Sequence, residues 1–274
     1  MKMTGLFGVA VAALLSAGTA SAGPVFLTGH DPDFHALDSP GAATLLTTAL
    51  NFVTGNTTFA AGHKFLYVQS NVAPPGGFRD GNLTLAHIGL VQGTNYDQVD
   101  ATGLAALSSF SAYSAIVVAS DFGAMLRDAE IQQLTTMAPQ IATFINAGGG
   151  LAAFAECGVG YSNCNSSNVN ASTPLFGFLP VTVSSVDTFA PYSVTAYGAG
   201  LGLSNADVND PTHNSFGLIG GLNVVDTDFN GTATTLAGVV TISGGHFNTP
   251  EPISIGLFGA GLLGAGLLRR RRRK

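Results

Sequence analysis

The 274-residue chain has no tryptophan and few charged side chains, which make up only 9% of its residues. An ordinary soluble domain carries about 25%. This shortage excludes a coiled coil, a nucleic-acid binder and a charge-rich disordered chain. The apolar fraction is 46% and the mean hydropathy is +0.36, so the sequence predicts a protein that builds a globular core.

Basic residues are almost missing from the body of the chain. Between positions 23 and 249 the sequence has Lys64, Arg79 and Arg127 against fifteen acidic residues, a net charge of −12 with neutral histidines. Such a body repels nucleic acid and anionic lipid, and it suits cations or neutral glycans better. We therefore expect no nucleic-acid partner.

The first 22 residues have the pattern of a secretory signal peptide. A basic Lys2 precedes a short apolar stretch, and small residues follow up to Ala22. This pattern predicts export by the Sec translocon and cleavage by signal peptidase after Ala22. An uncleaved N-terminal anchor is the alternative, but the apolar stretch is too short to span a bilayer.

The other end of the chain has three consecutive parts. They are Pro250-Glu251-Pro252, an apolar stretch over 253–268 with five glycines, and a basic block over 269–274. The apolar stretch is shorter than the roughly 20 residues of a spanning helix, and glycine weakens helices, so a temporary membrane stop is predicted. The positive-inside rule places the basic block in the cytoplasm and the body across the membrane.

These three parts resemble the PEP-CTERM sorting signal of Gram-negative bacteria. The resemblance implies an exosortase that recognises Pro250, Glu251 and Pro252 and removes the tail. It also implies a host that makes extracellular polysaccharide, and a final location at the cell surface or outside the cell. The alternative is an uncleaved tail that tethers the protein to the membrane as a transmembrane helix.

Between the two ends, residues 23–249 predict one α/β domain in which strands alternate with helices. Apolar runs at 25–28, 64–69, 115–120 and 151–155 predict strands. Helices are expected from Pro40 to Gly55, over 82–91, over 101–110 and over 127–146, with a kink at Pro139. This alternation predicts an open, mostly parallel, doubly wound sheet of the flavodoxin-like kind. A β-rich part is expected after it, at 179–186, 192–197, 221–228 and 234–243.

The stretch from Ala115 to Gly158 resembles the class I glutamine amidotransferase-like fold. Its apolar strand, its helix ending in FINAGGG and its following strand carry the resemblance. In that fold the place of Cys157 is the nucleophile elbow. Here Ala155 and Val159 replace the usual glycines, and the family's His-x-Glu motif is absent downstream. Cys157 and His213 are therefore weak candidates for a catalytic pair.

Cys157 and Cys164 are the only cysteines. In an exported protein they are expected to form a disulfide, which is the alternative to a nucleophilic Cys157.

A ligand or metal site is predicted where the first, third and fourth strands end. The carboxyl ends of parallel strands share one sheet edge, where open α/β sheets bind ligands. A divalent cation, a hydroxyl-rich ligand or raised pKa values would relieve the repulsion between the carboxylates that gather there. Turn formation around Asp31-Pro32 is the alternative. The predicted site residues are His30, Asp31, Asp33, His35, Asp121 and Glu156.

Two further polar segments are interpreted as turns. Asp226 to Gly231 matches the start of a calcium loop, but Ala237 stands where its glutamate belongs, and a hairpin turn at Asn230-Gly231 explains the same residues. Residues 207–214 are expected to form a polar loop. The sequence as a whole favours an exported surface or matrix protein that binds without catalysis, and an exported hydrolase or amidase using Cys157 is the alternative.

Overall fold

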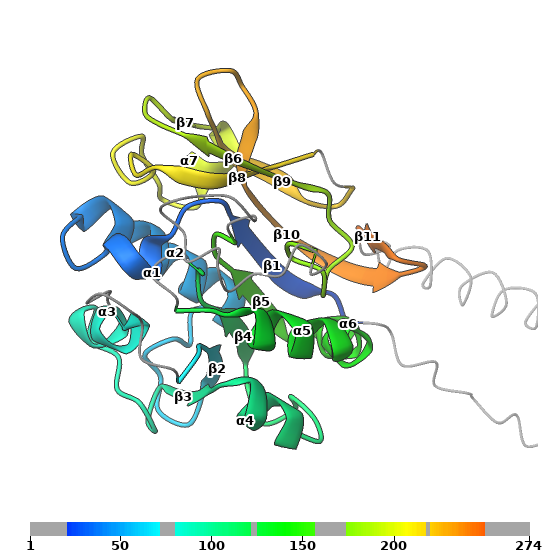
Figure 1. Cartoon of the computed structure of the whole chain (residues 1–274). Helices are drawn as coiled ribbons and strands as arrows, with labels where there is room; N and C mark the ends of the chain where they lie inside the picture. The colour runs from blue at the N-terminus through cyan, green and yellow to red at the C-terminus, as the bar shows by residue number, and fades with distance from the viewer. Residues whose placement is uncertain (1–20, 72–79, 122–124, 157–173, 218–219, 250–274) are drawn as a thin grey trace, which may run out of the picture.

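The computed structural model describes residues 21–71, 80–121, 125–156, 174–217 and 220–249. Its centre is a mixed sheet of eleven strands, whose main path runs β3-β2-β4-β5-β1-β10-β8-β6. One half of this sheet is parallel and lies between helices, and the other half is antiparallel (Figure 1). The predicted class, a mostly parallel open α/β sheet with C-terminal antiparallel strands, is confirmed.

The parallel half consists of five short strands. Residue pairs such as Val25 with Leu151 and Leu66 with Ile116 set their parallel register. Four of the strands are apolar and nearly all buried, as expected for strands covered on both faces, whereas the edge strand at 96–99 (YDQV) is partly polar and has only Tyr96 buried. The five strands are β1 (Gly23–Thr28), β2 (Phe65–Val68), β3 (Tyr96–Val99), β4 (Ala115–Val118) and β5 (Gly150–Ala153).

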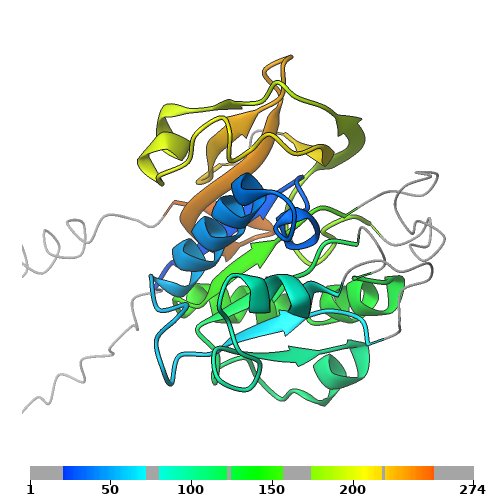
Figure 2. The ribbon, with the colours of Figure 1, turned by 90° about the vertical axis from the view of Figure 1, so that its left-hand side faces the viewer.

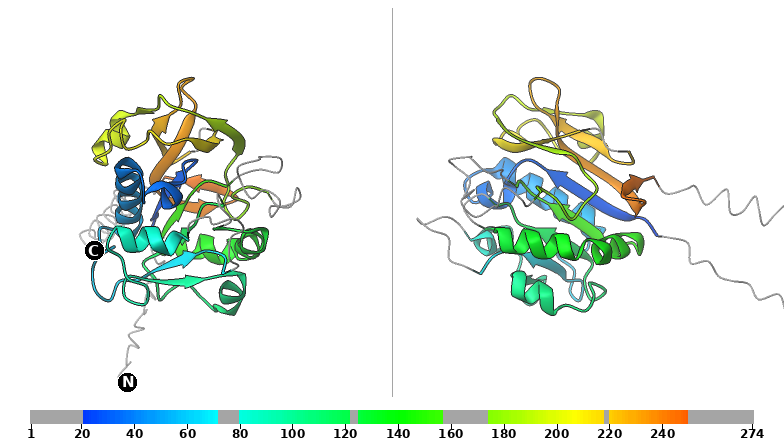
Figure 3. Two further views of the ribbon diagram at one scale, coloured as in Figure 1. Left: turned by 60° about the vertical axis from the view of Figure 1, so that its left-hand side comes forward. Right: turned by 45° about the vertical axis from the view of Figure 1, so that its right-hand side comes forward.

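Helices cover both faces of the parallel half, and Figure 2 and Figure 3 show them on opposite sides of the sheet. One face carries α1 (Pro32–His35), α2 (Pro40–Thr54) and α3 (Gly81–His87). The other carries α4 (Ala101–Ala106), α5 (Asp128–Thr136) and α6 (Ala138–Asn146).

Two hydrophobic cores result from the alternation of side chains along each strand. In β1, Val25 and Leu27 enter the core beneath α5 and α6, whereas Phe26 enters the core beneath α2. Ile116 and Val117 divide in the same way in β4. Each strand therefore holds both helix layers to the sheet.

The antiparallel half extends the sheet from β1 through β10, which pairs with β1 from Gly23–Val240 to Thr28–Thr235. β10 also pairs with β9 through a hairpin that contains Asn230 and Gly231, as predicted. The elements of this half are β6 (Val183–Thr188), β7 (Ser193–Val194), α7 (Ala196–Gly200), β8 (Thr212–Phe216), β9 (Asn223–Thr227), β10 (Ala233–Ser243) and β11 (His246–Asn248).

Several predicted elements differ from the structure. The helix expected over 127–146 is two helices that meet at Met137, because Pro139 occupies the first turn of α6, where its missing N–H costs nothing. Of the strand expected over 192–197, only β7 forms, and Thr195 then caps α7 through Gly198 N. The polar loop expected over 207–214 is wrong in its last part, because β8 begins at Thr212.

Both ends of the described body lie at one side of the sheet, where Gly23 is opposite Val240 and Asn248 is opposite Thr241 (Figure 3). The signal peptide up to position 20 and the sorting tail from position 250 lie outside the described residues. Within the described ranges, no helix is long and apolar enough to cross a bilayer.

Candidate functional site

The predicted site residues gather at the carboxyl ends of the parallel strands. His30 and Asp31 follow β1, Asp121 follows β4 and Glu156 follows β5. The structure buries them: each has a relative exposure of 2% or less. We call this group, with Asp33, His35 and the partners described below, the carboxyl-edge cluster. Its members divide into separate local pairs.

His30 pairs with a residue from the antiparallel half. Its Nε2 lies 3.0 Å from Asp226 Oδ2, and its Nδ1 lies 2.9 Å from the carbonyl oxygen of Asp210. Burial alone would lower the pKa of His30, but the Asp226 carboxylate outweighs it and the pKa is raised. His30 therefore links the loop after β1 to β9 through a buried contact with Asp226.

Asp31 faces two imidazoles. Its Oδ2 lies 3.5 Å from His35 Nε2 and 3.6 Å from His213 Nε2, while His213 Nδ1 lies 2.8 Å from Asp187 Oδ1. Burial would lower the pKa of His213, but the two carboxylates raise it to about 9. His213 is therefore a cation at neutral pH.

Asp33 and Glu156 are carboxyl groups held in the interior. The Asp33 Oδ2 accepts hydrogen bonds from Ser120 N at 2.8 Å and from the Tyr67 hydroxyl at 3.3 Å. Burial raises its pKa to about 7 in spite of the bond from Ser120. Burial likewise raises the pKa of Glu156 to about 8, against the hydrogen bond from Phe176 N and with a contribution from the Asp121 charge.

The raised pKa values of Asp33 and Glu156 and the charged His213 thus relieve part of the repulsion that the sequence predicts at this edge. Across the residues that the structure describes, no group of three or more His, Cys, Asp or Glu side chains is arranged to hold a metal ion. The raised pKa values of Asp33 and Glu156 agree with the pKa alternative, and a cation or a hydroxyl-rich ligand at this edge stays a prediction.

His213 is poorly suited to act as a general base. A base must be neutral to accept a proton, and the carboxylates of Asp31 and Asp187 hold this imidazole in its charged form. Cys157 and Cys164 lie outside the described residues, so their disulfide stays a prediction.

The predicted hairpin explains the calcium-like motif. Asp228 Oδ1 accepts hydrogen bonds from Asn230 N and Thr232 N, which closes the turn. Asp226 Oδ2 instead accepts a hydrogen bond from Thr234 Oγ1 at 2.6 Å and pairs with His30. Asp228 therefore stabilises the turn, whereas Asp226 binds Thr234 and His30 in the interior.

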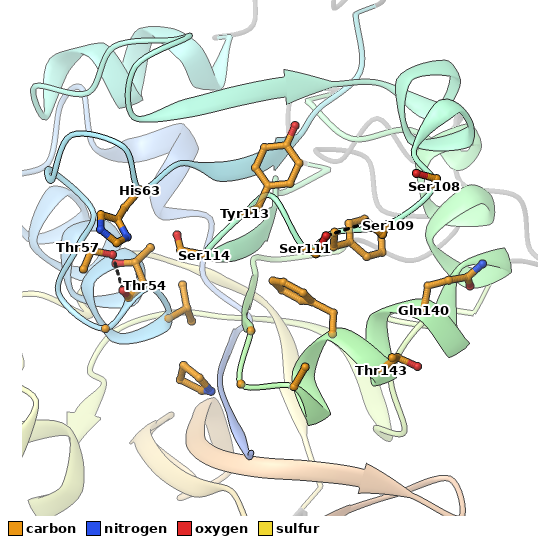
Figure 4. A pocket seen from close by; sticks show the side chains of 18 residues that line it. Thr54, Thr57, His63, Ser108, Ser109, Ser111, Tyr113, Ser114, Gln140 and Thr143 are labelled. Atoms are coloured by element: carbon orange, nitrogen blue, oxygen red, sulfur yellow. Dashed lines mark hydrogen bonds between the residues drawn. The ribbon is translucent and has the colours of Figure 1, made fainter. Parts of the chain in front are cut away.

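A pocket of about 800 Å³ lies at the opposite edge of the sheet, at the amino end of the parallel strands (Figure 4). The ends of α2 and α6 and the segment before β4 form it. We call it the hydroxyl pocket. Its polar lining residues are Thr54, Thr57, His63, Ser108, Ser109, Ser111, Tyr113, Ser114, Gln140 and Thr143.

Aromatic rings supply much of the apolar lining of the hydroxyl pocket. Phe110 and Phe144 are in contact, with ring centroids 5.9 Å apart, and Tyr113 lines the same space. Among the described lining residues there is no Asp, Glu, Lys or Arg. No sequence pattern predicts this pocket, although the run SSFSAYS over 108–114 is a local enrichment in hydroxyl and aromatic side chains.

Comparison with known proteins identifies one segment. The PEP-CTERM protein-sorting motif matches residues 248–273, which confirms the predicted sorting signal. No curated protein and no solved structure matches the chain, so no neighbour supports the more specific likeness to the amidotransferase-like fold.

Proposed function

We propose that this chain is an exported cell-surface or matrix protein, sorted by an exosortase, whose body binds a saccharide in the hydroxyl pocket without catalysing a reaction. The sorting motif at 248–273 supports export and recognition by an exosortase. The saccharide ligand is the finer part of the proposal, and it links the protein to extracellular polysaccharide.

The composition of the pocket carries this proposal. Saccharides present hydroxyl groups at the ring edges and C–H groups on the ring faces. The pocket offers complementary hydroxyl groups together with Phe110, Tyr113 and Phe144. A lining without Asp, Glu, Lys or Arg, within the described residues, suits an uncharged hydroxylated ring better than a phosphate or a sulfate.

Titration of residues 23–249 with neutral oligosaccharides tests the binding role. We expect saturable binding by calorimetry, weakened in Gln140→Ala, because Gln140 lines the pocket and is exposed. Gln132→Ala is the matched control, since Gln132 is an exposed α5 residue outside the lining. Equal affinity in both variants, or no binding by any saccharide, would overturn the proposed ligand.

Intact-mass measurement of protein from the native host tests the processing. We expect a mature chain that begins at Gly23 and ends near Pro250. Retention of the basic block over 269–274 in most molecules would instead support the membrane-tethered alternative.

A further inference from the structure

Two helices direct their carboxyl ends at the hydroxyl pocket. The last turn of α2 contributes Val53 and Thr54, and α6 contributes Thr143 and Phe144, with Ala147 directly after it. A helix carries about half a negative charge at its carboxyl end. Neither helix has a basic residue in its last turn to offset that charge. The negative ends of both helix dipoles therefore face the pocket, whose described lining has no carboxylate.

The hydroxyl groups of the lining add acceptors. Four of them donate their only proton to a backbone carbonyl: Thr54 to Leu50, Thr57 to Thr54, Ser114 to Lys64 and Thr143 to Pro139, at 2.6–3.1 Å. A hydroxyl that donates its proton in this way keeps only lone pairs to offer. At these four hydroxyl groups a ligand therefore meets acceptors and must itself donate the hydrogen bond.

The charged surroundings also favour a cationic ligand. Lys64, whose carbonyl accepts from Ser114, is paired with Asp97 at 3.0 Å, so the pair adds no net charge beside the pocket. Tyr113, Phe110 and Phe144 line the pocket, and aromatic rings attract cations that approach their faces. The body as a whole has a net charge of −12, which attracts positive ligands and repels acidic ones.

From these observations we propose that the hydroxyl pocket selects saccharides that carry a free, protonated amino group over N-acetylated, neutral and uronic-acid saccharides. This inference rests on the proposed function and names its ligand class. An ammonium group is a donor with three protons and a positive charge, so it matches lone pairs, helix carboxyl ends and aromatic faces together.

Calorimetry with matched trisaccharides of glucosamine, N-acetylglucosamine, glucose and glucuronic acid tests the selectivity. At low salt and pH 7 we expect the glucosamine trisaccharide to bind about tenfold more tightly than the glucose trisaccharide, with the preference shrinking in high salt. Equal affinity for the two would overturn the inference and leave saccharide binding intact. Binding by none of the four would overturn both. Spermidine carries positive charge but no sugar ring. If spermidine bound the pocket as tightly as the glucosamine trisaccharide and displaced it, the pocket would select charge alone, and the selection of a saccharide would be overturned.

Two lysine variants, one inside and one outside the pocket, test the role of charge. Gln140→Lys adds a cation to the lining, so the ratio of glucosamine to glucose affinity should fall at least fivefold. Gln132→Lys adds the same charge on α5, outside the lining, where Asp128 can pair with it, and should leave the ratio unchanged. An identical ratio in both variants would contradict the inference.

Discussion

The Nε2 atom of His213 lies 3.6 Å from the Oδ2 atom of Asp31, across the junction between the two halves of the sheet. Asp31 follows the parallel strand β1, whereas His213 belongs to the antiparallel strand β8. Asp31 is completely buried, and the side chain of His213 has a relative exposure of only 7%. This ion pair therefore links the two halves beside the backbone pairing of β1 with β10, and its strength depends on protonation.

Replacement of His213 should destabilise the fold strongly. His213→Gln leaves the buried Asp31 carboxylate with one fewer cation, and breaking a buried pair costs roughly 3–5 kcal/mol of unfolding free energy. Urea unfolding at pH 7 measures the loss. Asp31→Asn in the same chain should restore part of it, because the uncompensated charge is then gone.

His35→Gln is the matched control for this variant. His35 lies 3.5 Å from the same carboxylate, but its side chain is 28% exposed, so water compensates for its removal. We expect a loss well below that of His213→Gln. Equal losses would mean that burial does not set the strength of these pairs.

Stability should fall as the pH rises from 5 to 9. The folded pKa values of Asp33, Glu156 and His213 are raised from 3.8, 4.5 and 6.5 to about 7, 8 and 9. The folded state therefore binds protons more tightly than the unfolded state. The resulting stability is fully present below each unfolded pKa and is lost as the pH rises through each folded pKa.

Calorimetric melting across this range provides the measurement. We expect the highest Tm near pH 5 and a continuous decline to pH 9. In Glu156→Gln the decline between pH 5 and 8 should be shallower, because one of the three groups no longer titrates. A Tm that increases towards pH 9 would contradict the assignment of these protonated groups.

The predicted parallel strands were located correctly because each is a continuous apolar run, such as AIVVAS before Asp121. β8 was missed because its sequence, THNSF, is polar and yet completely buried. Its burial depends on partners far away in the chain: Asp187 and Asp31 for His213, and the backbone of Glu156 for Asn214. No local sequence pattern predicts such contacts between residues that are far apart in the chain.

The candidate site was predicted only in part, for a similar reason. The convergence of Asp31, Asp121 and Glu156 follows from strand order alone, but their burial and histidine partners do not. The hydroxyl pocket arises where the ends of α2 and α6 meet the segment before β4. These parts are separated by tens of residues, so each looks like an ordinary helix end or loop in the sequence.

Asn214 should contribute to stability through the backbone of Glu156. Its Oδ1 accepts from Glu156 N at 2.8 Å, and its Nδ2 donates to Glu156 O, so one side chain joins β8 to the segment that follows β5. Asn214→Ala leaves both buried backbone groups unsatisfied and should cost roughly 1–3 kcal/mol. Asn248→Ala removes hydrogen bonds at an exposed position and should cost less than about 0.5 kcal/mol in the same urea experiment.

Gly149→Ala should weaken saccharide binding while the protein stays folded. A methyl group at Gly149 would lie 2.3 Å from Cζ of Phe144, far inside van der Waals contact, so the ring must move. Phe144 is half-buried and lines the hydroxyl pocket, which gives the ring room to turn into the space that a ligand would occupy. We expect at least a fivefold loss of affinity by calorimetry and a small decrease in Tm.

Gly200→Ala, with no atom within 4 Å of the added methyl group, should change neither measurement. Unchanged affinity in Gly149→Ala would show that the ligand does not contact Phe144 and would place the binding site elsewhere on the molecule.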